Sequence, residues 1–237
     1  MAQQQIIAMG GGGFSESLEN LALDRYILEQ ATKPDPAIGF LATASGDAPT
    51  YITRFYQAFS RLGCTPSHLS LFEPHTADLE GYIMEQDIIY VGGGNTRSML
   101  ALWREWELDI ILRDAYEAGV VLAGISAGAI CWFYEGTTDS IPGRLTQIPC
   151  LGLLPHSCSP HYDGEIDRRP AMQQLIATGD MRPGYGIDND AALHFIDGEL
   201  HRAITAREGA AAYSVEKDGD AITETLQDMM LLSPVRG

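Results

Sequence analysis

The chain has 237 residues, 45% of them hydrophobic, which suits one large α/β domain over residues 1–237 better than two small domains. Its 15 basic and 32 acidic residues give a net charge of −17, which argues against nucleic acid or an anionic membrane surface as a partner. The four cysteines show no Cys-x-x-Cys spacing, and the N-terminus has no basic region or long apolar run. We therefore expect reduced cysteines and a cytoplasmic location.

Strand and helix signals alternate along the first half of the chain. An apolar strand over residues 5–9 runs into Gly10–Gly13, and a helix is expected from there to about Ala31. The glycine run lacks the third glycine of a dinucleotide-binding motif, so we interpret it as a tight turn beside a ligand site. The next expected elements are strands over 38–44, 69–72 and 87–91, a helix over 50–62, and a helix-poor acidic crossover over 76–85.

A long helical stretch, interrupted or bent near residues 106–108, returns the chain at Gly119 to another apolar strand. Alternation of this kind predicts a three-layer, doubly wound α/β fold with a mostly parallel sheet and functional residues at the carboxyl ends of its strands. The later segments are short strands that we interpret as an antiparallel extension of that sheet. One lies within 184–190 and ends in an acidic turn at Asp188, Asn189 and Asp190, and the others are 191–195, 200–205 and 211–215.

The stretch 120–129 is the clearest functional signal. A β-branched apolar run breaks into Gly-x-Ser-x-Gly at Gly124–Gly128, and a buried helix over 129–133 is expected to follow. This pattern predicts a nucleophile elbow, in which a sharp strand-to-helix turn exposes Ser126. Side chains in place of Gly124 and Gly128 would collide with the neighbouring strand and helix.

A second loop, Gly92–Thr96, follows the preceding strand. If the two strands are neighbours, the backbone amides of Gly94 and Ala127 converge on one oxygen and form an oxyanion hole, with Asn95 placed to contact the substrate. A serine nucleophile also needs a base, and six histidines are available. We predict His161, because Pro160 stiffens its loop.

Four motifs resemble, in order and spacing, the dipeptidase E and cyanophycinase family of serine peptidases. They are Gly92-Gly93-Gly94-Asn95-Thr96, Gly124-Ile125-Ser126-Ala127-Gly128-Ala129, Thr137-Thr138-Asp139 and Pro160-His161-Tyr162. The resemblance covers about residues 5–205 and implies a class I glutamine amidotransferase-like, flavodoxin-like fold. It also implies a Ser-His-Asp/Glu triad in which Ser126 is the nucleophile and His161 the base.

The acid of this triad is left open. Asp139 stands where the family's Thr-Thr-Asn-Asp motif supplies the acid, but one residue of that motif is missing here, and Glu135 and Asp163 are alternatives. The expected reaction is amide hydrolysis through an acyl-enzyme, by a serine-type dipeptidase or exopeptidase, with no metal or cofactor.

Three other functions compete with the peptidase. A glutaminase of the amidotransferase type would need cysteine in the elbow, which Ser126 excludes, and Cys131 lies too far along the helix to replace it. An esterase of the α/β-hydrolase class shares the elbow, and a non-catalytic ligand-binding module could keep the fold. The oligomeric state is open, and a homodimer is one arrangement that the sequence allows.

The expected partner is a small peptide substrate. Arg168 and Arg169 lie shortly after the predicted base, where dipeptidase E relatives carry an arginine-bearing segment that recognises an aspartyl side chain. Two guanidinium groups near the cavity would bind a carboxylate and favour peptides with an acidic residue on the acyl side of the cut. A solvated helix start, with Pro170 in its first turn, is the alternative interpretation.

Overall fold

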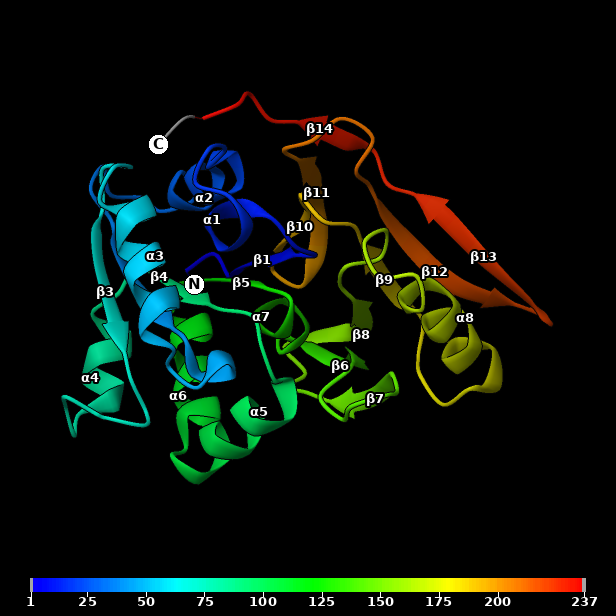
Figure 1. Ribbon diagram of the computed structural model, residues 1–237, viewed down its shortest axis with the longest axis horizontal. Helices are drawn as coiled ribbons and strands as arrows, with labels where there is room; N and C mark the ends of the chain where they lie inside the picture. Colours follow the sequence, from blue (N-terminus) through cyan, green and yellow to red (C-terminus); the bar gives the residue numbers. More distant parts are fainter. Residues whose placement is uncertain (1, 236–237) are drawn as a thin grey trace.

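Two β-sheets organise the computed structural model, which describes residues 2–235 (Figure 1). The first contains β1 (Gln5–Met9), β2 (Ala37–Leu41), β3 (Thr65–Leu69), β4 (Ile88–Val91), β5 (Val121–Ile125), β10 (Ala191–Ile196), β11 (Glu199–Thr205) and β14 (Met229–Leu231). The second contains β6 (Phe133–Thr138), β7 (Thr146–Pro149), β8 (Leu154–Ser159), β9 (Gly184–Ile187), β12 (Ala212–Asp218) and β13 (Ala221–Leu226). Their strand orders are β14-β11-β10-β1-β5-β4-β2-β3 and β13-β12-β9-β8-β6-β7.

Helices cover both faces of the eight-stranded sheet, and the last one along the chain packs against the six-stranded sheet. They are α1 (Gly13–Glu16), α2 (Ala22–Leu28), α3 (Pro49–Phe59), α4 (Leu79–Met84), α5 (Thr96–Glu105), α6 (Leu108–Ala118), α7 (Ala127–Ile130) and α8 (Arg168–Thr178), with a 3₁₀ turn η1 (Thr43–Ser45). Within residues 2–235, none of them is long and apolar enough to cross a membrane.

The two faces of the sheet follow from the alternation of side chains along each strand. On β1, Ile7 and Met9 belong to the core that includes α2 and α3, whereas Ile6 and Ala8 belong to the core that includes α5 and α6. The predicted mixed α/β fold around a mostly parallel sheet is confirmed. The parallel pairs β1·β5, β5·β4, β4·β2 and β2·β3 bring the carboxyl ends of these strands to one edge.

The C-terminal part of the chain differs from the sequence prediction. The strand at 184–187 and the strand at 212–218 belong to the second sheet, whereas β10 pairs antiparallel with β1 in the middle of the first. Short strands of mixed polarity do not reveal which sheet they join, because pairing depends on contacts far apart in sequence. The expected single sheet with an antiparallel extension is therefore two sheets.

Several local boundaries also differ. The predicted first helix is divided into α1 and α2, and the acidic crossover contains the short helix α4. The third strand lies at Thr65–Leu69, earlier than predicted, and α7 ends at Ile130 because the fully buried Phe133 already begins β6. The predicted interruption between α5 and α6 is confirmed at Glu107, whose φ is 56°.

Candidate active site

Ser126 occupies the turn between β5 and α7, with φ 56° and ψ −113°. A positive φ is strained for a residue with a side chain and persists only where the surrounding structure enforces it. Here the enforcement is close packing: a Cβ at Gly124 would overlap the carbonyl oxygen of Gly128, and one at Gly128 would overlap that of Val91. The predicted collisions are confirmed, and the turn fixes Ser126 at the carboxyl edge of the sheet.

His161 contacts Ser126 from the segment that follows β8. Its Nε2 lies 2.9 Å from the Ser126 Oγ, and its Nδ1 lies 2.7 Å from the Oδ1 of Asn189. An amide oxygen only accepts hydrogen bonds, so Nδ1 carries the proton and Nε2 presents its lone pair to the serine hydroxyl. The backbone also holds the ring, because the His161 amide donates to the carbonyl oxygen of Gly10 at 3.2 Å.

Asn189 is fixed from three directions. Its backbone amide donates to the Oδ1 of Asp163 at 2.8 Å, and its carbonyl oxygen accepts from Arg207 at 3.1 Å. Arg207 and Asp163 are themselves ion-paired at 2.6 Å. The third direction is the glycine run, because a Cβ at Gly11 would overlap the Asn189 Oδ1. The run is thus a tight turn against the site, as predicted, and its lack of side chains leaves room for the asparagine.

None of the three predicted acids occupies the position beside the His161 Nδ1. Asp139 is largely exposed and lies 3.6 Å from Arg168, and Glu135 accepts from the Arg182 amide at 2.8 Å. The imidazole Nδ1 faces the loop between β9 and β10, whereas Asp139 and Glu135 are carried by the β6 segment. Asp163 reaches the site only through the Asn189 backbone.

Sequence reasoning missed Asn189 as the partner of His161. The run 188–190 is polar and lies between two expected strands, and this position at a strand end was the available signal. What the sequence did not reveal is that β10 pairs with β1, which brings this turn beside the Gly10–Gly13 loop.

Two buried carboxyl groups lie close to this framework. Burial raises the pKa of Asp188 to about 6, and its Oδ2 accepts from the Ala211 amide at 2.9 Å. Burial likewise raises the pKa of Asp24 to about 7 from 3.8, and its Oδ2 accepts from the Phe14 amide at 2.9 Å. Since the folded protein holds the Asp24 proton more tightly than the unfolded chain, this group's contribution to stability falls as the pH rises through that interval.

The Gly92–Thr96 loop lies beside Ser126, because β4 and β5 are parallel neighbours as the oxyanion hypothesis required. A Cβ at Gly93 would lie 3.7 Å from the Ser126 Oγ. Within residues 2–235, the backbone amides of Gly94 and Ala127 donate to no other residue. Two unpaired amides flank the serine and are available to an anion.

A cavity of about 320 Å³ opens at Ser126. Its lining residues are Gly94, Asn95, Ser126, Asp139, Ser140, His161, Glu165 and Arg168. Asn95 caps α5, where its Oδ1 accepts from the Ser98 amide at 2.9 Å, and its Nδ2 donates to the carbonyl oxygen of Ser140 at 3.2 Å. Most of the predicted site residues therefore meet at one cavity.

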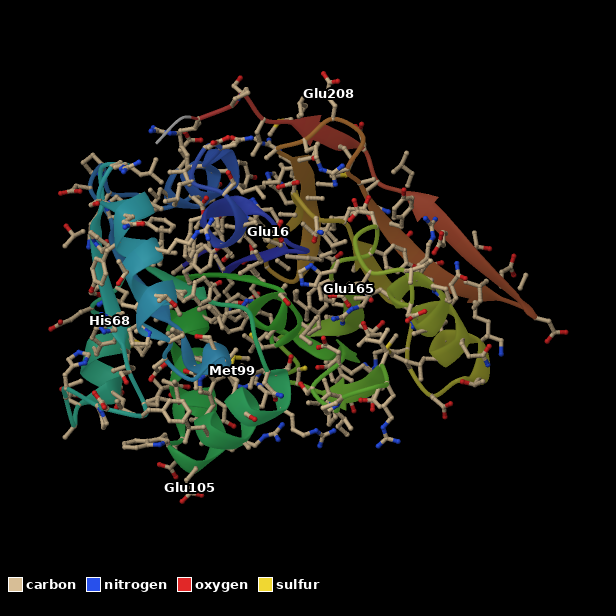
Figure 2. All side chains as sticks on the ribbon, in the orientation of Figure 1. Glu16, His68, Met99, Glu105, Glu165 and Glu208 are labelled. Atoms are coloured by element: carbon tan, nitrogen blue, oxygen red, sulfur yellow. The ribbon has the colours of Figure 1, made fainter. Side chains whose placement is uncertain are left out.

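Arg168 and Arg169 have different environments. The guanidinium of Arg168 is buried and lines the cavity. It donates to the Glu165 carboxylate at 2.6 Å and to the carbonyl oxygen of Thr137 at 3.1 Å. Glu165 is labelled in Figure 2. Arg169 instead pairs with Glu224 and stacks on Tyr213 at 4.7 Å. The expected pair of arginines at the cavity is therefore a single one, because successive residues on a helix point in different directions.

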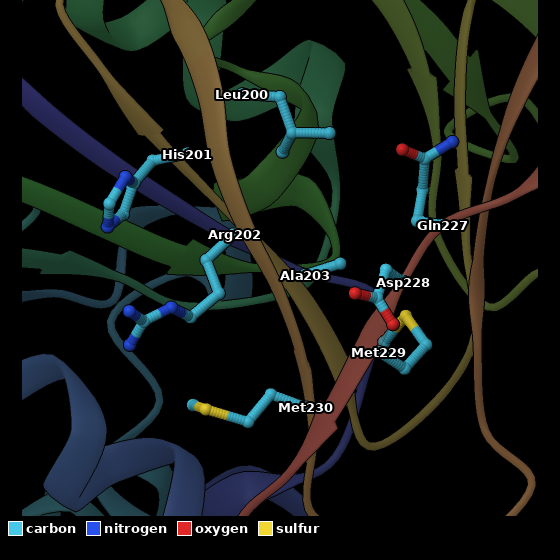
Figure 3. Close-up of a pocket in the computed structure, with 8 residues that line it drawn as sticks. All are labelled: Leu200, His201, Arg202, Ala203, Gln227, Asp228, Met229 and Met230. Atoms are coloured by element: carbon cyan, nitrogen blue, oxygen red, sulfur yellow. The ribbon is translucent and has the colours of Figure 1, made fainter.

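A separate hollow of about 430 Å³ lies between β11 and β14 (Figure 3). Its lining includes His201, Arg202, Asp228 and Met230, and it shares no residue with the Ser126 cavity. It therefore takes no part in the arrangement around the serine.

The sequence matches a known protein family over most of its length. The sequence model of Peptidase family S51 matches residues 6–203, so the chain belongs to that family, as its resemblance to dipeptidase E predicted. It is 59% identical over 212 residues to the uncharacterized peptidase YgaJ of Bacillus subtilis, covering 90% of this chain and 92% of that protein. It is also 32% identical over 130 residues to peptidase E of Shewanella amazonensis, covering 50% of this chain and 54% of that one.

Two crystal structures share the fold. A peptidase from an acI-B1 Actinobacterium superimposes with a TM-score of 0.72 at 16% identity, over 98% of this chain and 97% of that one. A putative peptidase E of Listeria monocytogenes superimposes with a TM-score of 0.64 at 20% identity, over 84% of this chain and 98% of that one.

Proposed function

We propose that this protein is a serine-type peptidase that hydrolyses small peptides, dipeptides among them, with Ser126 as nucleophile and His161 as base. The observation that carries this proposal is the contact of 2.9 Å between the His161 Nε2 and the Ser126 Oγ. A nucleophile, a base and a group that orients the base form the arrangement that acyl transfer requires. The turn at Ser126 is, in this proposal, the nucleophile elbow of a class I glutamine amidotransferase-like fold.

The reaction follows from the geometry. His161 takes the proton of Ser126 as its oxygen attacks the amide carbonyl, and the amides of Gly94 and Ala127 stabilise the tetrahedral oxyanion. The imidazolium then protonates the leaving amine, and an acyl-enzyme remains on Ser126. Water, activated by the same histidine, releases the acid product. Asn189 keeps the proton on Nδ1 but, being neutral, adds no charge to stabilise the imidazolium.

A fluorophosphonate probe tests the proposal directly. It should label Ser126, with the adduct located by peptide mass spectrometry, and dipeptides should be hydrolysed faster than matched esters relative to their uncatalysed rates. Absence of labelling would favour a non-catalytic member of the family. A preference for esters alone would favour an ester hydrolase. The cytoplasmic location and the homodimer stay predictions.

Substitutions distinguish the role of Asn189 from that of Asp139. Asn189→Ala removes the acceptor that fixes the histidine tautomer, so we expect kcat/KM to fall by about 100-fold or more. Asp139→Asn should change kcat/KM on a Leu-X dipeptide by less than about threefold, because an exposed carboxylate that does not touch the base contributes little. Steady-state kinetics on one dipeptide check both variants.

Asn189→Asp is the matched control. It keeps the acceptor and adds a negative charge that stabilises the imidazolium, so activity should persist while the acidic limb of the pH–rate profile moves to higher pH. A large loss in Asp139→Asn with little loss in Asn189→Ala would return the orienting role to the acid.

For the substrate, we propose that Arg168 alone binds a carboxylate on the acyl side of the cut. Glu165 and Thr137 occupy the inner donors of its guanidinium, whereas Asp139 lies at 3.6 Å and is largely exposed. A substrate carboxylate can therefore replace Asp139 at the outer edge of this guanidinium.

We predict that kcat/KM is about tenfold higher for Asp-X than for Leu-X dipeptides. This ratio corresponds to the lower end of the free energy that a hydrogen bond to a charged group contributes. Arg168→Lys should reduce this preference, because an ammonium group does not reproduce the planar fork, and Arg169→Ala should leave it unchanged. Asp139→Asn should lower KM for Asp-X by removing the competing carboxylate. Equal rates on Asp-X and Leu-X in the unmodified protein would refute the carboxylate site while leaving the peptidase proposal intact.

A further inference from the structure

The oxyanion loop is held by residues far from the cavity. Within residues 92–95 of this loop, three of the four backbone amides have partners: that of Gly92 donates to the Leu41 carbonyl oxygen at 3.0 Å, and that of Asn95 to the Ala44 carbonyl oxygen at 2.7 Å. The third, that of Gly93, donates to the hydroxyl of Tyr51 at 3.3 Å. Among residues 92–95, the Gly94 amide alone remains available. The orientation of the Gly94 amide therefore depends on these three hydrogen bonds, of which the third is to a side chain.

The partner of the Gly93 amide is a side chain from a distant element, because Tyr51 lies in α3. Burial raises the pKa of Tyr51 above its usual value, so the hydroxyl keeps its proton. Its oxygen accepts from the Gly93 amide, and its second hydrogen-bond partner is the Oγ of Ser15, where either hydroxyl can be the donor. The ring packs against Gly92 and stacks on Phe14 with centroids 5.5 Å apart.

Ser15 connects this pair to the base. It lies on α1, directly after the glycine run whose Gly10 carbonyl oxygen accepts from the His161 amide at 3.2 Å. The Gly11 carbonyl oxygen accepts from the Asp190 amide at 3.1 Å, beside Asn189. One short segment therefore contacts the base and its partner at one end and, through Tyr51, the oxyanion loop at the other.

We propose that Tyr51, held by Ser15, is a positioning residue that aligns the Gly94 amide with the oxyanion formed at Ser126. This inference rests on the proposed peptidase function. Tyr51 does not line the Ser126 cavity, so it acts through Gly93 and has no contact with substrate. Without its acceptor, the Gly93 amide loses its partner and the adjoining peptide is free to rotate. A preorganised donor that moves by a fraction of an ångström stabilises the transition state less, while binding of the substrate is unaffected.

The test is Tyr51→Phe, which keeps the ring and removes only the hydroxyl. We expect kcat to fall by about 10- to 100-fold with KM changed by less than about threefold. The second-order rate of fluorophosphonate labelling should fall in parallel, since the phosphonyl oxygen occupies the oxyanion position. Ser15→Ala should have a smaller effect in the same direction. Rates are referred to active sites titrated to completion with the same probe, so partial unfolding cannot imitate the loss.

Tyr56→Phe is the matched control on the same helix. Its hydroxyl pairs with the Nδ1 of His68 at 2.8 Å, and Figure 2 shows His68 near the β3 edge, away from Glu165. We expect it to leave kcat and the labelling rate unchanged. An unchanged kcat and labelling rate in folded Tyr51→Phe, or a raised KM alone, would overturn the positioning role. Failure of the peptidase proposal would show differently, as full activity in Ser126→Ala.

Discussion

Ser126→Ala is expected to lower kcat/KM on a dipeptide substrate by on the order of 10³-fold or more, because it removes the proposed nucleophile while the oxyanion amides remain. The melting temperature should stay nearly unchanged, since within residues 2–235 the Oγ makes a single hydrogen bond, to His161. The measurements are steady-state kinetics and a thermal melt.

Ser60→Ala, at the end of α3 and away from the cavity, is the control for expression and handling. Retention of most activity in Ser126→Ala, with Ser60→Ala unaffected, would remove the serine peptidase assignment.

The second large effect is expected from His161→Ala, which should be nearly as damaging as Ser126→Ala. The two residues act as a unit, so the double variant should be no slower than the slower single variant. Kinetics on the same dipeptide, extended to long incubation times, check this non-additivity.

Two other histidines serve as comparisons. His156 packs beside Tyr185, and His156→Ala should leave kcat nearly unchanged. His194 is 1% exposed, its Nδ1 lies 2.8 Å from the Tyr26 hydroxyl, and burial lowers its pKa to about 4. His194→Ala should therefore lower the melting temperature by removing a buried hydrogen-bonded group. A loss of activity confined to either variant would mean that the base is misassigned.

The sequence was most informative where local chemistry decides structure. The strand-turn-helix pattern at 120–129 predicted both the exposed serine and the collisions that make Gly124 and Gly128 necessary. The β-branched run at 87–91 predicted the strand beside it, and the parallel pairing of these two strands brought Gly94 next to Ser126, as expected. These features depend on a few consecutive residues and on the rule that parallel strands end at one edge.

Prediction failed where a contact depends on topology. An acid was expected at Asp139, directly after β6, or at Glu135 or Asp163, but the group beside His161 is an amide from the turn before β10. Nothing local in 188–190 distinguishes this turn from a solvated one. Its role exists only because β10 pairs with β1 and because Arg207, beyond β11, holds the Asn189 carbonyl. Likewise, Arg169 turned out to pair with Glu224, a residue 55 positions further along the chain.

Because Asn189 lies late in the sequence, it leaves the ribosome after the residues that it orients. A nascent chain that has emerged as far as β8 and α8 contains Ser126 and His161 but lacks Asn189 and Arg207. Its histidine has no fixed tautomer, and β10 has not yet joined β1 to bring the turn into place. In the proposed mechanism, the complete arrangement of base and tautomer-fixing partner therefore forms only after residues 189–207 have been synthesised and β10 has docked on β1.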